Sequence, residues 1–123
     1  MSFIWVDYLT VASTEHSDTS GYAEACLRST ISRAYYAALN TARKLLREQW
    51  GIEVPETAEI HRFIPQWFMN EEDLDRKEIG TLLDRLRDRR RKADYDDEIS
   101  KISSLATRSL IDAQLVIDYV STL

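Results

Sequence analysis

Residues 21–50 read GYAEACLRSTISRAYYAALNTARKLLREQW, and this stretch decides the fold. Small and apolar side chains recur along it at spacings of three and four, the period of an α-helix that packs through one face. They form two adjacent rows: Ala23, Leu27, Thr30, Ala34, Ala37 and Thr41, and then Ile31, Tyr35, Ala38, Ala42 and Leu45. Two such rows predict a helix covered on much of its surface, at the centre of a bundle. Gly51 is expected to end it, because glycine favours the left-handed conformation of a C-terminal helix cap.

Weaker helical patterns lie on both sides of this central segment. They run from about Phe3 to Ala12, from Thr57 to Phe68, from Glu71 to Leu86 and on into charged residues, and from about Asp97 to Tyr119. Pro65 interrupts the second, which predicts a kink or two short helices. Apolar residues of the last segment follow a heptad pattern suited to antiparallel packing on another long helix. The sequence therefore predicts an all-α, up-and-down helical bundle of four main helices plus a short broken helix.

Composition fits a single helical domain over residues 1–123. The chain is 44% hydrophobic and 30% charged, and it contains only three Gly and two Pro. So few turn-forming residues exclude a β-sandwich or a β-barrel. No apolar stretch approaches the roughly 18 residues that span a membrane, and the first residues lack the basic region of a secretion signal. We therefore expect a cytoplasmic protein that does not enter a membrane.

Charge and residue chemistry narrow the possible functions. Sixteen Lys and Arg stand against 21 Asp and Glu, a net charge of −5, which argues against a protein that coats nucleic acid through bulk charge. One local basic run exists, since six basic residues lie between Arg85 and Lys92. One Cys and two distant His cannot supply a zinc site, and three isolated glycines do not form a phosphate loop. We expect no metal and no cofactor, and any anion site should be local.

Arg90 is the first candidate for a binding residue. It continues the apolar row of Leu83 and Leu86 by one turn, so its side chain is expected on the core-facing side of its helix. A buried charge without a partner is costly there. Two interpretations follow: Arg90 pairs with Asp94 or Asp97 as an ordinary surface contact, or it lines a polar cleft that binds phosphate or backbone oxygens.

A polar row on the central helix is the second candidate. Ser29, Arg33, Tyr36 and Asn40 follow one another beside the apolar rows. The row is either a solvated face or a surface where Arg33 and Tyr36 reach a nucleotide or a partner chain, by a bidentate phosphate contact or by stacking. His61 stands near an apolar face and is interpreted either as a hydrogen-bonded structural histidine or as a catalytic base.

Three pieces of sequence then stand in a characteristic order. They are Tyr8-Leu9 with Ala12, the run SRAYYA at residues 32–37 and the run RRKADYD at residues 90–96, with His61 between the second and the third. Together they resemble the HEPN family, the higher eukaryotes and prokaryotes nucleotide-binding domains, over nearly the whole chain. The resemblance implies a bundle of about five helices that forms a homodimer and lines a cleft with an arginine-containing motif. Many members are metal-independent ribonucleases, often toxins paired with a nucleotidyltransferase-type antitoxin, or parts of defence systems.

The family's usual motif is an arginine, a polar residue and then a histidine five to seven positions after the arginine. The resemblance places the arginine at Arg90, and the histidine position then falls at Tyr95, Asp96 or Asp97, none of which is a histidine. RNA cleavage without metal needs an acid and a base, and histidine serves as both near neutral pH. We therefore predict a non-catalytic module that binds RNA, a nucleotide or a partner nucleotidyltransferase in a toxin–antitoxin or defence-type system. The alternative is a ribonuclease in which Asp94 or Tyr95 replaces the histidine.

Two sets of candidate site residues follow from these patterns. The residues expected to bind a ligand are Arg33, Tyr36, Arg87, Arg90 and Asp97. If the chain is an enzyme, the residues expected to act in catalysis are Arg90, Asp94 and Tyr95. A narrow four-helix core covers large aromatic rings only in part, which adds to the expectation of a homodimer; the rings in question are those of Trp5, Trp50 and Trp67.

Overall fold

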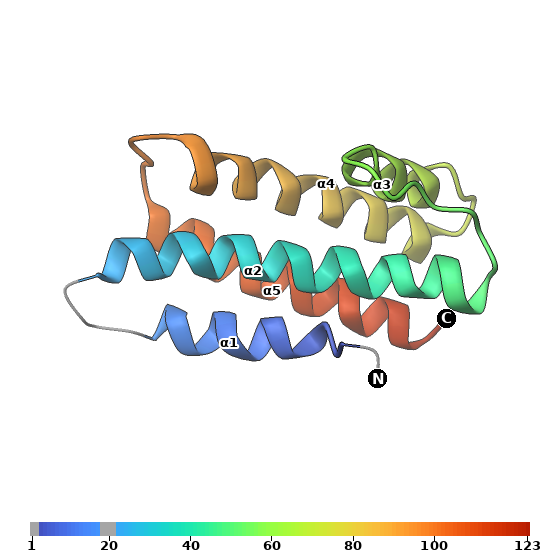
Figure 1. The fold of residues 1–123 in the computed structure, drawn as a ribbon, viewed down its shortest axis with the longest axis horizontal. Coiled ribbons are helices and arrows are strands. Elements are labelled where there is room, and N and C mark those ends of the chain that lie inside the picture. The colour runs from blue at the N-terminus through green and yellow to red at the C-terminus, as the bar shows by residue number, and fades with distance from the viewer. Residues whose placement is uncertain (1–2, 18–21) are drawn as a thin grey trace.

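The computed structural model describes residues 3–17 and 22–123, and every regular element within them is helical. The elements are α1 (Val6–His16), α2 (Ala23–Lys44) with a π-helical extension η1 (Leu45–Gln49), α3 (Ile60–Met69), α4 (Leu74–Tyr95) and α5 (Ile102–Ser121). Helices α1, α2, α4 and α5 run along the long axis in alternating directions, while α3 crosses one end of α4 (Figure 1). The expected all-α, up-and-down bundle is confirmed. No helix in the described residues is long and apolar enough to cross a lipid bilayer.

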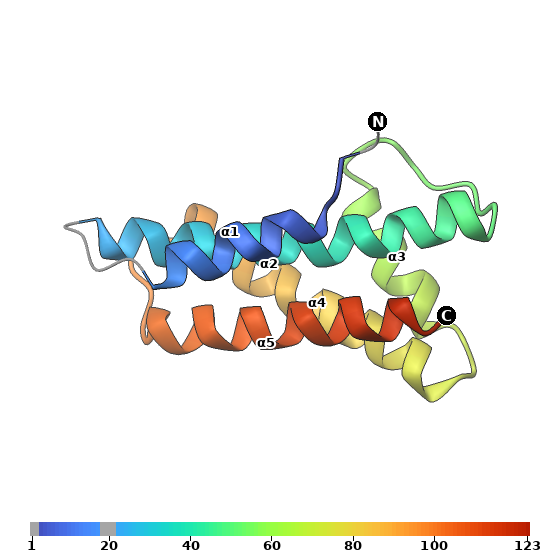
Figure 2. The ribbon, with the colours of Figure 1, turned by 90° about the horizontal axis from the view of Figure 1, so that it is seen from below.

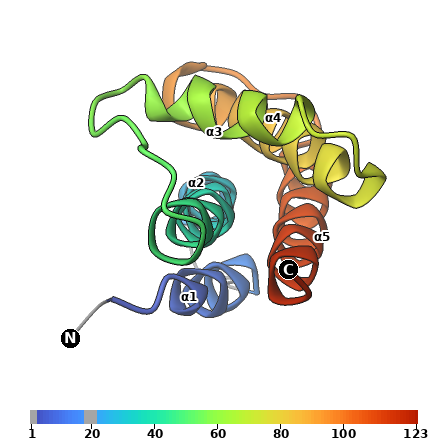
Figure 3. The same cartoon turned by 90° about the vertical axis from the view of Figure 1, so that its right-hand side faces the viewer.

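Helix α2 is the central helix, as its two apolar rows predicted. Helices α1, α4 and α5 all pack against it, and the end-on view shows it between α1 and α4 (Figure 3). Ala34, Ala37 and Ala38 are completely buried, and their small side chains let the neighbouring helices approach closely. Gly51 follows η1 with a φ of +64°, which confirms it as the glycine that ends this long segment.

Two of the flanking helices differ from expectation. Helix α1 continues to His16, beyond the expected end at Ala12, and Glu15 in its last turn forms an ion pair with Arg33 of α2. Helix α3 is one continuous helix through Pro65, so the prediction of two short helices is wrong. Proline removes one backbone donor, and the helix continues through it where Pro65 is buried and its carbonyl oxygen closely approaches Gly80 of α4.

The link between α4 and α5 begins where the last helix was expected to start. Helix α4 ends at Tyr95, and the guanidinium of Arg28 donates hydrogen bonds to the backbone carbonyls of Ala93, Asp96 and Asp97 at 3.0, 2.6 and 3.1 Å. These bonds satisfy acceptors that the end of a helix leaves open. The expected helix start at Asp97 is therefore wrong, and α5 begins at Ile102. Helix α5 runs antiparallel to α1 and α4 and parallel to α2 (Figure 2).

Candidate functional site

Arg90 lies inside the bundle, against two tyrosines of α2. The residue is only 9% exposed, and its guanidinium carbon lies 5.3 Å from the ring centre of Tyr35 and 5.7 Å from that of Tyr36. A guanidinium over aromatic faces is attracted by their electron density, and this attraction grows when water is excluded. Arg90 thus occupies the core-facing side of α4, the side on which its place in the apolar row puts it.

His61 of α3 reaches the same two tyrosines. The Tyr35 hydroxyl oxygen lies 2.5 Å from His61 Nδ1, the two rings stack with centres 5.7 Å apart, and Tyr36 meets His61 edge-on at 6.0 Å. Burial lowers the pKa of His61, and the charges of Arg90 and Arg87 lower it further. Burial also raises the pKa of Tyr35 above its usual value. At neutral pH the imidazole is therefore uncharged and the tyrosine hydroxyl keeps its hydrogen.

These residues make up the Arg90 cluster, which we define as Tyr35, Tyr36, His61, Arg87 and Arg90. Its nearest carboxylate is that of Asp94, whose Oδ2 lies 3.5 Å from Arg90 Nη1. The Nε atoms of Arg87 and Arg90 are buried and have no hydrogen-bond partner within the described part of the chain. A buried donor without an acceptor costs free energy until a ligand or a water supplies an oxygen. The cluster therefore contains arginine donors that the described residues leave without acceptors, and it carries surplus positive charge.

Arg33 belongs to a different contact. Its Nε lies 2.8 Å from a carboxylate oxygen of Glu15 and 3.1 Å from the hydroxyl of Ser29, and its guanidinium lies over the Tyr8 ring at 5.6 Å. Arg33 therefore ties α2 to α1, while Tyr36, one turn further along, contacts Arg90 of α4. The two candidate binding residues therefore contact different helices.

The candidates after Arg90 lie at or beyond the end of α4. The Asp94 side chain contacts Arg90, and Tyr95 is 75% exposed. Asp97, expected as a possible partner of Arg90 and as a binding residue, lies beyond the end of α4 at Tyr95. The backbone carbonyl of Asp97 instead accepts a hydrogen bond from Arg28.

Arg89 has a structural contact of its own. Its Nη2 lies 2.8 Å from Asp112 Oδ2 of α5, and the two side chains are 13% and 8% exposed. The arginines of the basic run therefore face different neighbours. Arg89 contacts α5. The charges of Arg87 and Arg90 act instead on the buried tyrosine of α2 and on His61. A run of like charges in the sequence does not reveal this division.

Sequence reasoning missed Tyr35 and did not connect His61 with Arg90. Tyr35 was assigned to an apolar row, although a buried tyrosine hydroxyl needs a hydrogen-bond partner. This need for a partner is the signal in the sequence that could have predicted a polar residue beside Tyr35 on a neighbouring helix. The partner is His61, which the bundle brings to the Tyr35 hydroxyl from α3.

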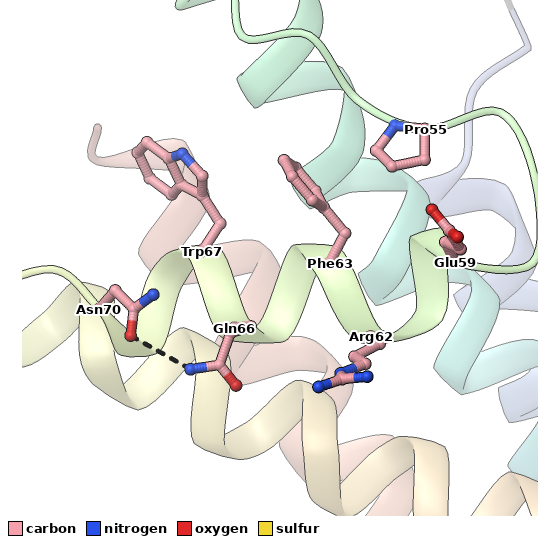
Figure 4. A pocket seen from close by; sticks show the side chains of 7 residues that line it. All are labelled: Pro55, Glu59, Arg62, Phe63, Gln66, Trp67 and Asn70. Carbon is pink, nitrogen blue, oxygen red and sulfur yellow. Dashed lines mark hydrogen bonds between the residues drawn. The ribbon is translucent and has the colours of Figure 1, made fainter.

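A separate hollow of about 460 Å³ lies on the outer side of α3 (Figure 4). Phe63 and Trp67 form its apolar part, and Gln66 donates a hydrogen bond to Asn70 along its edge. None of the residues that line it belongs to the Arg90 cluster. It is therefore a distinct surface feature of α3.

The three tryptophan rings find partners within the chain itself. Trp50 lies 5.5 Å from Trp67 between ring centres, Arg76 covers Trp50 at 4.5 Å, and Arg43 covers Trp5 at 5.5 Å. All three rings are half-buried. They therefore give less support to a second copy than the sequence suggested, and the homodimer stays a prediction.

Replacing Arg90 should destabilise the protein more than replacing Asp94. Arg90→Ala removes a buried side chain and its contacts with two tyrosine rings, so we expect a loss of about 1–2 kcal/mol in the free energy of unfolding. Asp94 is partly exposed and only 3.5 Å from its partner, so Asp94→Ala should cost at most about 0.5 kcal/mol. Urea unfolding followed by circular dichroism measures both changes. Equal losses for the two variants would contradict this ranking.

A comparison of the sequence with known protein families finds a match. The family model described as HEPN domain matches residues 12–123, which include α2 to α5 and the whole Arg90 cluster. No curated protein and no solved structure shows a significant match to the chain. Because the family model covers nearly all of the sequence, the chain belongs to the HEPN domain family.

Proposed function

We propose that the chain is a HEPN module that binds the phosphate groups of RNA or of a nucleotide at the Arg90 cluster and does not cleave them. The observation that carries this proposal is the buried guanidinium of Arg90, held over Tyr35 and Tyr36 with an Nε that has no partner in the described residues. A guanidinium is suited to phosphate because its donors form a rigid planar fork.

The charge of the cluster supports a small, local contact. Arg87 and Arg90 carry one more positive charge than Asp94 balances, while His61 is neutral. The whole chain has a net charge of −5, so bulk attraction to nucleic acid is absent. Affinity should therefore come from about two phosphate contacts and should fall moderately as salt rises.

The geometry gives little support to the ribonuclease alternative. Asp94 is engaged with Arg90, and Tyr95 is directed into solvent. His61 has its Nδ1 occupied by the Tyr35 hydroxyl, and the other histidine, His16, contacts Thr107 of α5. Cleavage without metal requires both a base and an acid at the same phosphate. The described residues of one chain do not supply this pair at the Arg90 cluster.

The biological setting is part of the same proposal and rests on the family alone. HEPN domains often occur in toxin–antitoxin and defence-type systems, beside a nucleotidyltransferase-type protein. We propose a similar setting for this chain, with a homodimer as the working form.

Salt-dependent RNA binding tests the proposal. Fluorescence anisotropy with a labelled oligouridylate should show binding by the wild-type protein, with a slope of log K against log salt of about −1.4 for two phosphate contacts. Arg87→Ala should lower the affinity about tenfold and bring the slope to about −0.7, because one contact is lost. Arg108→Ala is the matched control, since it removes the same charge from an exposed position on α5.

Two results would count against the proposal. If Arg87→Ala and Arg108→Ala bind equally well, the phosphate does not lie at the Arg90 cluster. If wild-type protein cleaves the RNA in the presence of a chelator and Arg87→Ala does not, the chain is a ribonuclease and the non-cleaving assignment fails.

A further inference from the structure

Three groups from three helices meet at the Arg90 cluster: a guanidinium of α4, a hydroxyl of α2 and an imidazole of α3. The guanidinium of Arg90 lies over the Tyr35 ring, and its charge acts on the Tyr35 hydroxyl. The hydroxyl oxygen is 2.5 Å from His61 Nδ1. The Tyr35 hydroxyl thus stands between a permanent cation and a group that can accept a hydrogen.

Tyr35 and His61 are both uncharged near neutral pH, so the tautomer of His61 decides which of the two donates the hydrogen between them. Burial raises the pKa of Tyr35, and burial together with Arg90 and Arg87 lowers the pKa of His61. A guanidinium only donates, so a tyrosine oxygen that turns a lone pair toward Arg90 can direct its hydrogen to Nδ1. A neutral imidazole that accepts at Nδ1 carries its own hydrogen on Nε2.

We propose that His61 donates this Nε2–H to the bound phosphate as a third, uncharged donor beside Arg87 and Arg90, and that Tyr35 holds His61 in the required tautomer. The inference rests on the proposed function and adds to it a residue outside the arginine motif. His61 is half-buried, whereas Tyr35 is fully buried, so a ligand reaches the imidazole but not its partner. Tyr35 is therefore a positioning residue, and His61 is the residue that contacts the ligand.

A neutral donor has a signature that separates it from a cationic one. It strengthens binding through a hydrogen bond, but it displaces no counterion, so it leaves the salt dependence unchanged. It also gives an affinity that stays level from about pH 6.5 to pH 8, because an imidazole with a lowered pKa does not gain a proton in that range. The groups facing His61 are Tyr35 and Tyr36 from α2 and Arg87 and Arg90 from α4.

Nitrogen NMR of the histidines tests the tautomer without a ligand. The chain has two histidines, so His16→Gln leaves His61 as the one imidazole signal, and His16 lies elsewhere, bonded to Thr107. We expect His61 to carry its hydrogen on Nε2 at pH 7. Tyr35→Phe keeps the buried ring and removes the hydroxyl, so His61 should then show a mixture of both tautomers. A wild-type imidazole with its hydrogen on Nδ1 would overturn the inference.

Oligouridylate binding tests the donor role. His61→Ala should weaken binding about five- to tenfold with the salt slope unchanged, in contrast to Arg87→Ala, which lowers the slope. His61→Gln keeps an N–H donor and should restore part of the affinity, and His16→Gln should bind as the wild type does. Thermal unfolding of each variant shows that the compared proteins are folded.

The outcomes distinguish this inference from the function on which it rests. If wild-type protein binds no oligouridylate, the proposed function fails and the donor role fails with it. If the wild type binds and His61→Ala binds equally well, the phosphate site stands and the donor role is refuted. An affinity that rises steeply as the pH falls from 8 to about 6.5 would show a cationic His61 and would also refute it.

Discussion

Gly80→Ala should destabilise the protein by about 2–3 kcal/mol, even though alanine is the better helix former by about 1 kcal/mol. A Cβ at Gly80 would lie 2.6 Å from the carbonyl oxygen of Pro65, 2.7 Å from Cγ of Met69 and 2.9 Å from the backbone nitrogen of Met69. Two of these three atoms belong to the backbone of α3, so a change of rotamer cannot relieve the contact. Helix α3 would have to move away from α4.

Gly51→Ala is the matched control for this substitution. Its Cβ would meet nothing within 4 Å, but its backbone has a φ of +64°, which costs a residue other than glycine about 1 kcal/mol. Urea unfolding should therefore rank the two variants, with Gly80→Ala losing more. Because α3 carries His61, Gly80→Ala should also disturb the His61 NMR signal, and Gly51→Ala should not. A Gly80→Ala protein as stable as the wild type would show that α3 and α4 can move apart at this point without a loss of stability.

The central helix could be predicted because its evidence is local. Residues 21–50 repeat their apolar pattern over many turns, and Gly51 marks the end by its own conformational preference. The end of α4 could not be predicted in the same way. Its helical row continues in phase from Arg90 to Asp97, and the helix stops because Arg28 of α2 takes up the carbonyls at its C-terminus. A contact between distant segments decided that boundary.

Only the part of the candidate site that lies on a single helix could be predicted from the sequence. Periodicity placed Arg90 on the core-facing side of α4, and the buried position of Arg90 agrees. The contribution of His61 depends on where α3 lies, which is set by the close approach of Pro65 to Gly80. Arg33 contacts α1 while Tyr36 contacts α4, because α1 extends far enough to bring Glu15 against Arg33. Each of these facts depends on how helices pack, and a single helix pattern does not contain them.

Asp112→Ala should cause the larger loss of stability, about 3–5 kcal/mol. Asp112 and Arg89 form an ion pair of 2.8 Å between α5 and α4, with only 8% and 13% of their side chains exposed. Arg89 Nη1 is already buried without a hydrogen-bond partner among the described residues. Removing the carboxylate leaves the whole guanidinium in the bundle without a counter-charge, and the interior cannot solvate it. Urea unfolding followed by circular dichroism measures the loss.

A double substitution separates the cost of a stranded charge from the loss of the pair itself. Asp112→Leu combined with Arg89→Met replaces both charges by apolar side chains, so it should recover most of the stability that Asp112→Ala loses. Arg89 faces α5, whereas the Arg90 cluster faces α2 and α3. The double variant should therefore bind oligouridylate like the wild type, apart from the small effect of one fewer positive charge. A double variant no more stable than Asp112→Ala would mean that the pair itself holds α4 to α5. A stable double variant that no longer binds RNA would place the phosphate at Arg89 and not at Arg90, because Arg89 contacts α5 whereas Arg90 contacts α2.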